Sequence, residues 1–384
     1  MEEFDVIIIG AGASGTMCAL SADKDKRIAL VDAMSFPAKK LLVTGNGRCN
    51  LTNVKLSSDF YNQDLTKYFA MHDNSQTLSF FEELGLLINI DEESRVYPYS
   101  NSARTITDIL FKEIKKRNIF LFCEQNITKI TRMGEFYCVK TNDYVLYSKK
   151  VVFATGGNTN PEFFEELDIN LKPFVPSLCA LKTQSTKRLS GQKLSDVVVT
   201  AVCDGDKKQQ KGEVLFKDSG LSGIVIFNLS TLFARKNKFE GKVYIDTMPH
   251  ITIEDVFDLL TERKKIAETA GELLLGMFHH EINKEILWRN NLDEQTSIDE
   301  LDDNLIQAIA QTIKHFDFNV DGAYDNNQVF CGGVTLDQLD DTLQSINNHG
   351  IYFCGEICDV DGECGGYNLQ WAWTSGNIVG VNLW

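Results

Sequence analysis

The chain has 384 residues, 43% of them hydrophobic and 24% charged, which is the composition of a globular protein long enough for two domains. Its 38 Lys and Arg stand against 54 Asp and Glu, and the net charge of −16 disfavours broad binding to nucleic acid or to an anionic membrane. Because no apolar run approaches the roughly 20 residues of a membrane helix and no basic leader opens the chain, we expect a cytoplasmic protein. The ten cysteines form no CxxC pair, which favours reduced thiols and no metal site.

The first predicted element is a strand over residues 4–9, an apolar run of the kind buried on both faces of a parallel sheet. A helix follows it through the turn Gly10-Ala11-Gly12-Ala13-Ser14-Gly15, and a second strand over 27–31 ends at Asp32. This order is typical of dinucleotide binding, since the glycines admit a pyrophosphate to the helix N-terminus and the acid accepts hydrogen bonds from a ribose. Asp32 would repel a 2′-phosphate, so the pattern excludes NADP here and leaves NAD or FAD.

Residues 38–53 lose hydrophobic periodicity and indicate an ordered loop with a function. Helical patterns then extend to about residue 118, interrupted at 95–98, and a strand meander over 119–155 ends in the turn Ala154-Thr155-Gly156-Gly157. Further glycine-bearing strand ends occur at Gly355-Glu356 and at Gly365-Gly366, where a terminal helix begins. A cofactor lying across several strand ends fits this pattern better than NAD alone, which favours FAD.

Between residues 178 and 328 short strands give way to helices, without a second glycine signature. We therefore predict an inserted domain over 178–328 and a discontinuous cofactor domain over 1–177 and 329–384. Within the insert, residues 204–206 predict the turn of a hairpin whose tip is solvated. Ser297 and Glu300 have the spacing of a capping box, which predicts a helix from there to about Lys314.

More particular motifs span nearly the whole chain. They are residues 44–53, Ala154–Gly157, Gly212–Phe216 with Gly220–Gly223, Cys331–Val334, and Gly355–Gly362 followed by Gly365–Ala372. This set resembles the YhiN/BaiN-like family of bacterial flavoproteins. The resemblance implies an α/β, Rossmann-like FAD-binding fold of the two-dinucleotide-binding flavoprotein type, with non-covalent FAD and an inserted strand-and-helix domain that covers the flavin.

The resemblance also implies a role for each motif. The glycine turn would meet the pyrophosphate and Asp32 the adenosine ribose. Lys39, Lys40 and Gly45 to Asn50 would wrap the ribityl chain and one flavin face. Gly355 and Glu356 would lie by the pyrophosphate or ribityl hydroxyls, and Tyr367 to Leu369 at the pyrimidine edge. The complete predicted set is Gly10, Ala11, Gly12, Ala13, Ser14, Gly15, Asp32, Ala33, Lys39, Lys40, Gly45, Asn46, Gly47, Arg48, Cys49, Asn50, Ile127, Ala154, Thr155, Gly156, Gly355, Glu356, Gly366, Tyr367, Asn368 and Leu369.

Several of these residues have a second interpretation. Arg48 could lower the pKa of the Cys49 thiol, but no partner cysteine is close in sequence, so packing against the cofactor is favoured over catalysis. Tyr367 fits a stacking or positioning role better than proton transfer. Glu356, Asp359 and Asp361 could form a general-base cluster, although cofactor binding and turn formation fit them better. No catalytic acid or base is assigned.

Two classes of function remain open. The first is an FAD-dependent oxidoreductase that passes a hydride through flavin N5, from a transient NAD(P)H to a small organic acceptor that could be unsaturated or steroid-like, as in one branch of the family. The second is a non-catalytic flavin-binding redox sensor or assembly protein, motivated by a shorter turn after Gly157 than the family usually has. A nucleic-acid-modifying flavoenzyme is a third interpretation, which the acidity of the chain disfavours. The expected partner is a small-molecule substrate, with no nucleic acid and no membrane; the oligomeric state is not predicted.

Overall fold

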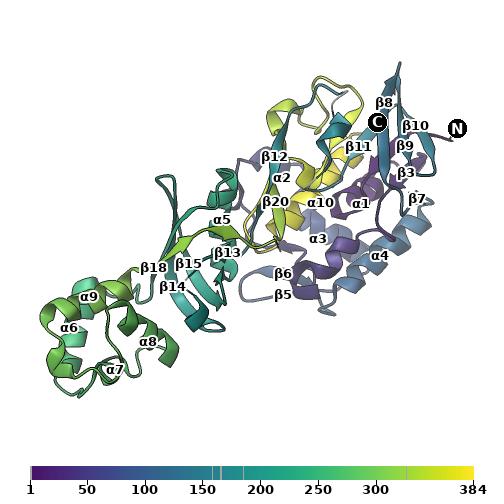
Figure 1. The fold of residues 1–384 in the computed structure, drawn as a ribbon. Coiled ribbons are helices and arrows are strands. Elements are labelled where there is room, and N and C mark those ends of the chain that lie inside the picture. The colour runs from purple at the N-terminus through teal and green to yellow at the C-terminus, as the bar shows by residue number, and fades with distance from the viewer. Residues whose placement is uncertain (1, 158, 165–166, 185, 326) are drawn as a thin grey trace. The chain divides into compact units, whose positions relative to one another are not determined.

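The computed structural model describes residues 2–157, 159–164, 167–184, 186–325 and 327–384, and the chain divides into two compact units (Figure 1). Unit 1 comprises Met1–Val175 and Val329–Trp384, and unit 2 comprises Pro176–Gln328. The chain therefore passes into unit 2 between residues 175 and 176, two residues before the predicted boundary between 177 and 178.

A parallel sheet forms the centre of unit 1. Its strands, in spatial order, are β21 (Ile351–Phe353), β11 (Val151–Phe153), β2 (Val6–Ile9), β3 (Ile28–Val31) and β7 (Phe120–Phe122). β2, β3, β11 and β21 are buried along their whole length, as their continuous apolar runs predicted. Because all strands run in the same direction, the turns that follow them meet at one edge of the sheet.

Smaller sheets surround this centre. One contains β1 (Glu2–Phe4), β10 (Val145–Ser148), β9 (Phe136–Thr141) and β8 (Ile127–Met133), and another contains β4 (Thr52–Asn53), β6 (Arg95–Pro98) and β5 (Ile88–Ile90). β12 (Leu171–Ser177) pairs with β20 (Val329–Val334), and these two strands carry the chain into and out of unit 2.

Helices of unit 1 include α2 (Thr66–Phe69), α3 (Asn74–Glu83) and α4 (Ala103–Lys116). The first and last helices, α1 (Ala13–Ser21) and α10 (Tyr367–Val381), lie side by side (Figure 1). A Cβ on Gly376 would overlap the carbonyl oxygen of Ser14, and one on Gly380 would lie 2.5 Å from that of Cys18. The second contact lies four residues further along both helices than the first, so α1 and α10 run parallel. Their backbones are so close that only glycine fits at these positions of α10.

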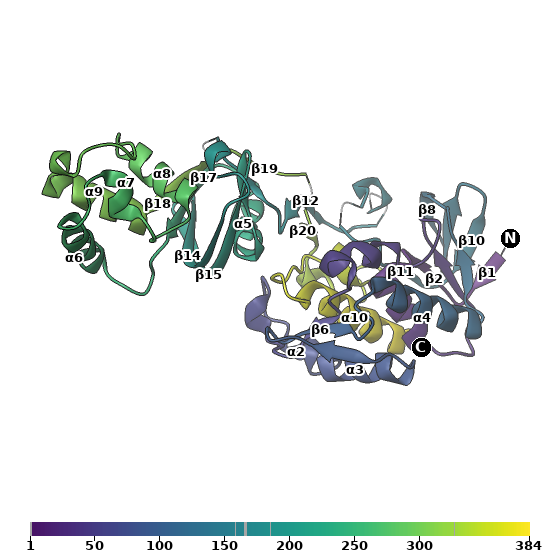
Figure 2. The same ribbon diagram turned by 90° about the horizontal axis from the view of Figure 1, so that it is seen from below.

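Unit 2 is built on an antiparallel sheet. Its strands, in spatial order, are β18 (Phe316–Val320), β17 (Gly241–Asp246), β14 (Lys193–Cys203), β15 (Asp206–Lys217), β16 (Gly220–Ser222), β13 (Leu181–Lys182) and β19 (Gly322–Ala323). Helix α5 (Ile224–Arg235) packs on β14 and β15, while α6 (Ile253–Lys264), α7 (Ala270–Leu274), α8 (His280–Arg289) and α9 (Asp303–Lys314) gather beyond the sheet (Figure 2). One apolar cluster joins sheet and helices.

Three sequence predictions differ in detail from the structure. Ser297 caps a short 3₁₀ turn by accepting from the N–H of Asp299, and the long helix α9 begins later, where Asp302 accepts from the N–H of Leu305. The turn Asp204-Gly205 does close the β14–β15 hairpin, but Asp206 already belongs to β15. Much of the 38–53 loop forms 3₁₀ turns over Lys39–Gly47.

Candidate cofactor-binding site

The glycine turn after β2 is tightly packed except at one position. A Cβ on Gly10, whose φ is +102°, would overlap the carbonyl oxygen of Ala154, and a Cβ on Gly15 would overlap that of Gly10. Among the residues that the structure describes, no atom lies within 4 Å of a Cβ built on Gly12. Gly12 is also the N-cap of α1 and provides no side-chain hydrogen bond to the first N–H groups. The turn therefore presents open space and unpaired donors at Gly12, which suits an anion.

Asp32 stands at the end of β3 and faces this turn. Its Oδ2 accepts a 2.6 Å hydrogen bond from the N–H of Ala11, and its Oδ1 accepts one of 2.7 Å from the N–H of Met34. In the described part of the chain no cation pairs with this carboxylate. The N–H of Gln125 donates to the carbonyl of Asp32 at 2.9 Å, which brings the start of β8, and with it Ile127, toward the end of β3. Ala33 follows Asp32 and is exposed.

Lys40, Gly156 and Glu356 converge at the neighbouring strand ends. A Cβ on Gly156 would lie 3.6 Å from Oε2 of Glu356 and 3.7 Å from Nζ of Lys40. Oε1 of Glu356 accepts a 2.7 Å hydrogen bond from the N–H of Phe330. Burial raises the pKa of Glu356, and the N–H of Phe330 and the charge of Lys40 offset part of that rise. The Lys39 ammonium lies instead 5.6 Å from the centre of the Phe36 ring, outside this cluster.

The segment from Gly45 to Asn50 bends through left-handed backbone at Gly45, Asn46, Gly47 and Cys49. Arg48 anchors it. Its guanidinium lies 4.4 Å from the centre of the Tyr97 ring, its Nη2 donates to Oη of Tyr97 at 3.4 Å, and its Nε donates to the carbonyl of Gly45 at 3.4 Å. Tyr97 was not selected from the sequence, although the Arg95–Pro98 interruption marked its position.

Cys49 is fully buried, and this burial raises the pKa of its thiol to about 12. The effect of burial is therefore opposite to the lowering that a neighbouring arginine could have produced. Cys49 is a thiol at neutral pH, which supports the packing role that the sequence favoured.

The N-terminus of α10 is fixed by a buried network of side chains. Thr52 donates through Oγ1 to Oε1 of Gln370 at 2.7 Å, and Nε2 of Gln370 donates to Oγ1 of Thr77 and of Thr374 at 3.0 and 2.9 Å. Gly366 caps the helix with φ of +102° and no side-chain hydrogen bond. The first N–H groups of α10 thus form a second set of unpaired donors in unit 1.

The side chains at the start of α10 are engaged within the protein. The Tyr367 ring stacks on Phe60 with centroids 4.4 Å apart, and its carbonyl accepts from the hydroxyl of Tyr61 at 2.8 Å. Burial raises the pKa of Tyr367 to about 12. Asn368 forms two hydrogen bonds with the backbone of Gly362, and Leu369 packs on the core. The main-chain N–H groups, rather than these side chains, are what this end of α10 offers to a ligand.

The two helix N-termini are separated by a defined stagger. Because Ser14 lies level with Gly376, α10 extends about eight residues beyond the start of α1, or roughly 12 Å at 1.5 Å per residue. Unit 1 therefore holds two groups of anion-attracting donors that face the same way and are offset by about 12 Å along the helix axes, with Asp32 beside the first. A molecule with a pyrophosphate at one end and a ring carrying carbonyl groups at the other fits this arrangement.

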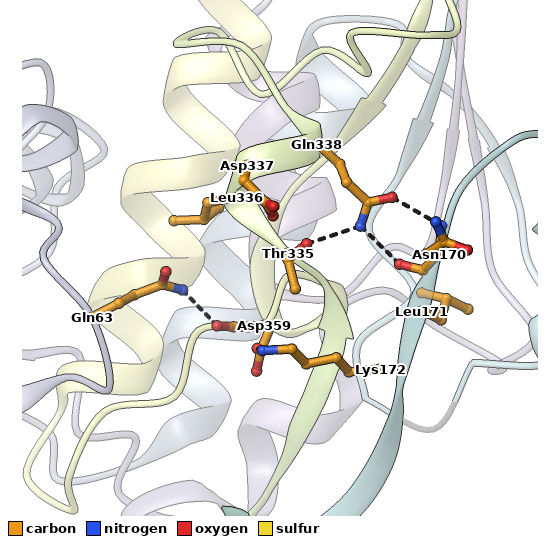
Figure 3. Close-up of a pocket in the computed structure, with 9 residues that line it drawn as sticks. All are labelled: Gln63, Asn170, Leu171, Lys172, Thr335, Leu336, Asp337, Gln338 and Asp359. Carbon is orange, nitrogen blue, oxygen red and sulfur yellow. Dashed lines mark hydrogen bonds and ion pairs between the residues drawn. The ribbon is translucent and has the colours of Figure 1, made fainter.

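A polar groove of about 590 Å³ lies elsewhere on unit 1 (Figure 3). It is lined by Gln63, Asn170, Leu171, Lys172, Thr335, Leu336, Asp337, Gln338 and Asp359, none of which belongs to the predicted cofactor set. Asp359, whose side chain is 5% exposed, pairs with Lys172 at 2.8 Å and accepts from the N–H of Gly332 at 3.2 Å. Asp359 therefore ties β12 and β20 to the loop before α10, a structural role.

Two features of these residues fit an extended dinucleotide. The space at Gly12 would be filled by any side chain, and the side-chain carbonyl of Asn50, buried beside Gly366, has no hydrogen-bond partner. A family model described as HI0933-like protein Rossmann domain matches residues 4–382. The chain belongs to this family. The predicted YhiN/BaiN-like membership and the Rossmann-like α/β fold are thereby confirmed.

Relatives of this HI0933-like chain have different described activities. A 3-dehydro-bile acid delta(4,6)-reductase from Clostridium scindens is 29% identical, and the match covers 97% of each chain. A ribosomal RNA dihydrouridine synthase from Escherichia coli is 27% identical over 98% of this chain and 96% of that protein. Among solved structures, 3-ketosteroid delta1-dehydrogenase from Sterolibacterium denitrificans is 12% identical with a TM-score of 0.49, covering 100% of this chain and 99% of that one. Within the described ranges, no helix is both long and apolar enough to cross a bilayer.

Proposed function

We propose that this chain is an FAD-dependent oxidoreductase that reduces a carbon–carbon double bond conjugated to a carbonyl group. One observation supports this above the others: the parallel helices α1 and α10 present two sets of N–H donors that face the same way and are offset by about 12 Å along the helix axes. The first, with Asp32, would hold the pyrophosphate and adenosine ribose. The second would face the carbonyl groups of the flavin ring. The other predicted cofactor residues are proposed to have the roles that the family resemblance implies for their motifs.

Bound FAD would supply a hydride from N5 to the acceptor after taking one from a reduced nicotinamide. The chain's own contribution is positioning and charge. The N–H groups of Tyr367 to Leu369 would stabilise negative charge at the pyrimidine edge, because a helix N-terminus carries partial positive charge. Lys40 would bring a cation to the strand ends beside Gly156. Hydride and proton add to the acceptor while NAD(P)H becomes NAD(P)⁺, so the overall equation balances.

The acceptor class follows from what two relatives have in common. A delta(4,6)-reductase acting on a 3-dehydro steroid and a dihydrouridine synthase both saturate a double bond conjugated with a carbonyl. The carbonyl makes the distant alkene carbon electrophilic, so it accepts a hydride, and the other carbon then takes a proton. We propose a small conjugated ketone as the acceptor, since the relative with the higher identity is a bile acid reductase and the chain is strongly acidic.

A uridine in RNA is a second candidate acceptor. The Escherichia coli relative supports it, and so does the local charge of unit 2, where residues 178–242 carry twelve Lys and Arg against six Asp and Glu. Several of these lysines are paired with carboxylates, as Lys193 is with Glu213, which weakens this candidate. An RNA substrate would bind with steep salt dependence and gain two mass units per uridine reduced.

An anaerobic titration tests the proposed function. Protein loaded with FAD should lose its oxidised-flavin absorbance when NADH or NADPH is added, and a 3-keto-4-ene steroid should restore it. Uridine-containing RNA added in place of the steroid tests the second candidate. The proposal fails if the purified chain takes up no FAD, or if no donor bleaches it. Bleaching without reoxidation by either acceptor would favour a non-catalytic redox sensor.

A further inference from the structure

Asn50 places an unsatisfied acceptor at the N-terminus of α10. The residue is 9% exposed, and its buried Oδ1 has no hydrogen-bond partner among the described residues. This oxygen lies 2.9 Å from where a Cβ on Gly366 would be. Buried amide carbonyls are almost always paired, because leaving one desolvated and unpaired is unfavourable. Because this orphan lies at the N-terminus of a helix, a ligand bound there could supply the missing donor.

Two side-chain donors from segments next to Asn50 are committed elsewhere. The Thr52 hydroxyl donates to Gln370, and the indole N–H of Trp373 donates to the carbonyl of Leu51 at 3.0 Å. The backbone also holds Asn50 in place, since Gly45 packs against it with no room for a side chain: a Cβ there would lie 2.9 Å from the Asn50 nitrogen. Asn50 is thus presented by a constrained segment rather than by a freely moving loop.

We propose that Oδ1 of Asn50 accepts the N3–H of the flavin pyrimidine ring, an inference that rests on the proposed function. The pyrimidine edge of oxidised flavin carries one N–H between two carbonyl groups. The N-terminus of α10 can donate to a carbonyl but cannot accept a hydrogen bond, so N3–H needs a separate acceptor. Asn50 provides one next to Gly366. It is a positioning residue that fixes the orientation of the ring and selects a ring with a donor at N3.

The first experiment measures a property of the bound flavin rather than turnover. The pKa of N3 is read from the absorbance of oxidised holoprotein as pH is raised, for the wild type, Asn50→Ala and Asn50→Asp. A hydrogen bond from N3–H to Oδ1 stabilises the protonated ring, so the N3 pKa should fall in Asn50→Ala. It should rise in Asn50→Asp, because a carboxylate favours the neutral N3–H over its anion. Asn89→Ala, which removes an exposed amide on β5, is the matched control and should leave the pKa unchanged.

The second experiment modifies the ligand and so does not depend on how well a variant folds. Wild-type apoprotein should bind 3-methyl-FAD, which lacks the N3 donor, at least about tenfold more weakly than FAD. Asn50→Ala should lose most of that discrimination. Equal affinity of the wild type for the two flavins, or an N3 pKa unchanged in both Asn50 variants, would overturn the assignment while leaving a yellow, functional protein. Failure of the wild type to bind FAD would overturn the proposed function together with this inference.

Discussion

The main-chain N–H of Ala11 donates a 2.6 Å hydrogen bond to Oδ2 of Asp32, joining the glycine turn to the end of the next strand across 21 residues. This bond orients the carboxylate while leaving lone pairs free for another donor. The same residue thus supports the turn and has acceptor capacity left for the proposed ribose hydroxyl.

Replacing Asp32 by Ala should weaken FAD binding about 10- to 100-fold, because a hydrogen bond to a charged acceptor contributes about 1.5–3 kcal/mol. Isothermal titration of apoprotein with FAD measures the change. Asp64→Ala is the matched control, since this exposed aspartate also accepts from a backbone N–H, that of Thr66 at 2.9 Å. An Asp32→Ala protein that binds FAD as tightly as the control would contradict the ribose assignment.

Alanine at Gly12 and at Gly15 should affect different properties. Gly12 has φ of −72° and open space around a Cβ, so Gly12→Ala apoprotein should unfold at the same urea concentration as the wild type. Its FAD affinity should fall at least about tenfold, because the methyl group occupies the space for the pyrophosphate. Gly15→Ala should lower the unfolding midpoint itself, since its Cβ overlaps the carbonyl of Gly10. Equal loss of apoprotein stability in both variants would show that Gly12 is only structural.

His72 should make stability depend on pH. It is 4% exposed, hydrogen-bonds through Nε2 with Thr77 at 3.0 Å, and burial lowers its pKa from 6.5 to about 4. Between pH 6.5 and 4 the unfolded chain binds a proton that the folded chain does not, so the free energy of unfolding falls as pH decreases through this window. The contribution is at most about 1.4 kcal/mol per pH unit and ends below pH 4.

Urea unfolding at several pH values measures this effect. His72→Gln should have a shallower pH dependence than the wild type between pH 4 and 6.5, whatever its absolute stability. His349→Gln, at an exposed position, should keep the wild-type dependence. Parallel curves for the wild type and His72→Gln would mean that His72 titrates normally in the folded protein.

Cys49 should resist alkylation. Its thiol is fully buried, so a reagent cannot reach it, and burial raises its pKa to about 12, so little reactive thiolate forms at neutral pH. Brief treatment of native protein with iodoacetamide, followed by peptide mass spectrometry, should label the partly exposed Cys123 before Cys49. Cys49→Ala should retain reduction of bound flavin by NAD(P)H. Rapid labelling of Cys49 with parallel loss of flavin reduction would restore a catalytic role.

The sequence predicted the elements that depend on local pattern. The apolar strand before Gly10, the acid at the end of the next strand and the terminal helix after Gly366 all occur as expected, because burial on both faces and helix capping leave a direct trace in residue order. Contacts between distant segments leave no such trace. Tyr97 beneath Arg48 and the N–H of Phe330 on Glu356 join residues far apart in the chain, and neither could be inferred without the fold.

The sequence also could not show that Lys39 and Lys40, which are adjacent and identical in type, have different surroundings. Only Lys40 reaches the cluster with Gly156 and Glu356, since successive residues on a 3₁₀ turn point in different directions. The motif likewise did not show which of its glycines has open space for a ligand. Only the space around each Cβ separates Gly12 from the packed glycines.

The close packing of α1 against α10 also sets an order of events during synthesis. The glycine turn is synthesised early, but α10, the helix that packs against it, lies in the segment Val329–Trp384. Unit 2 is contiguous and can fold while the nascent chain is still attached, whereas unit 1 must wait with the apolar faces of β2 and α1 uncovered until α10 has been synthesised. A premature stop before residue 366 would therefore yield a folded insert joined to an aggregation-prone remainder.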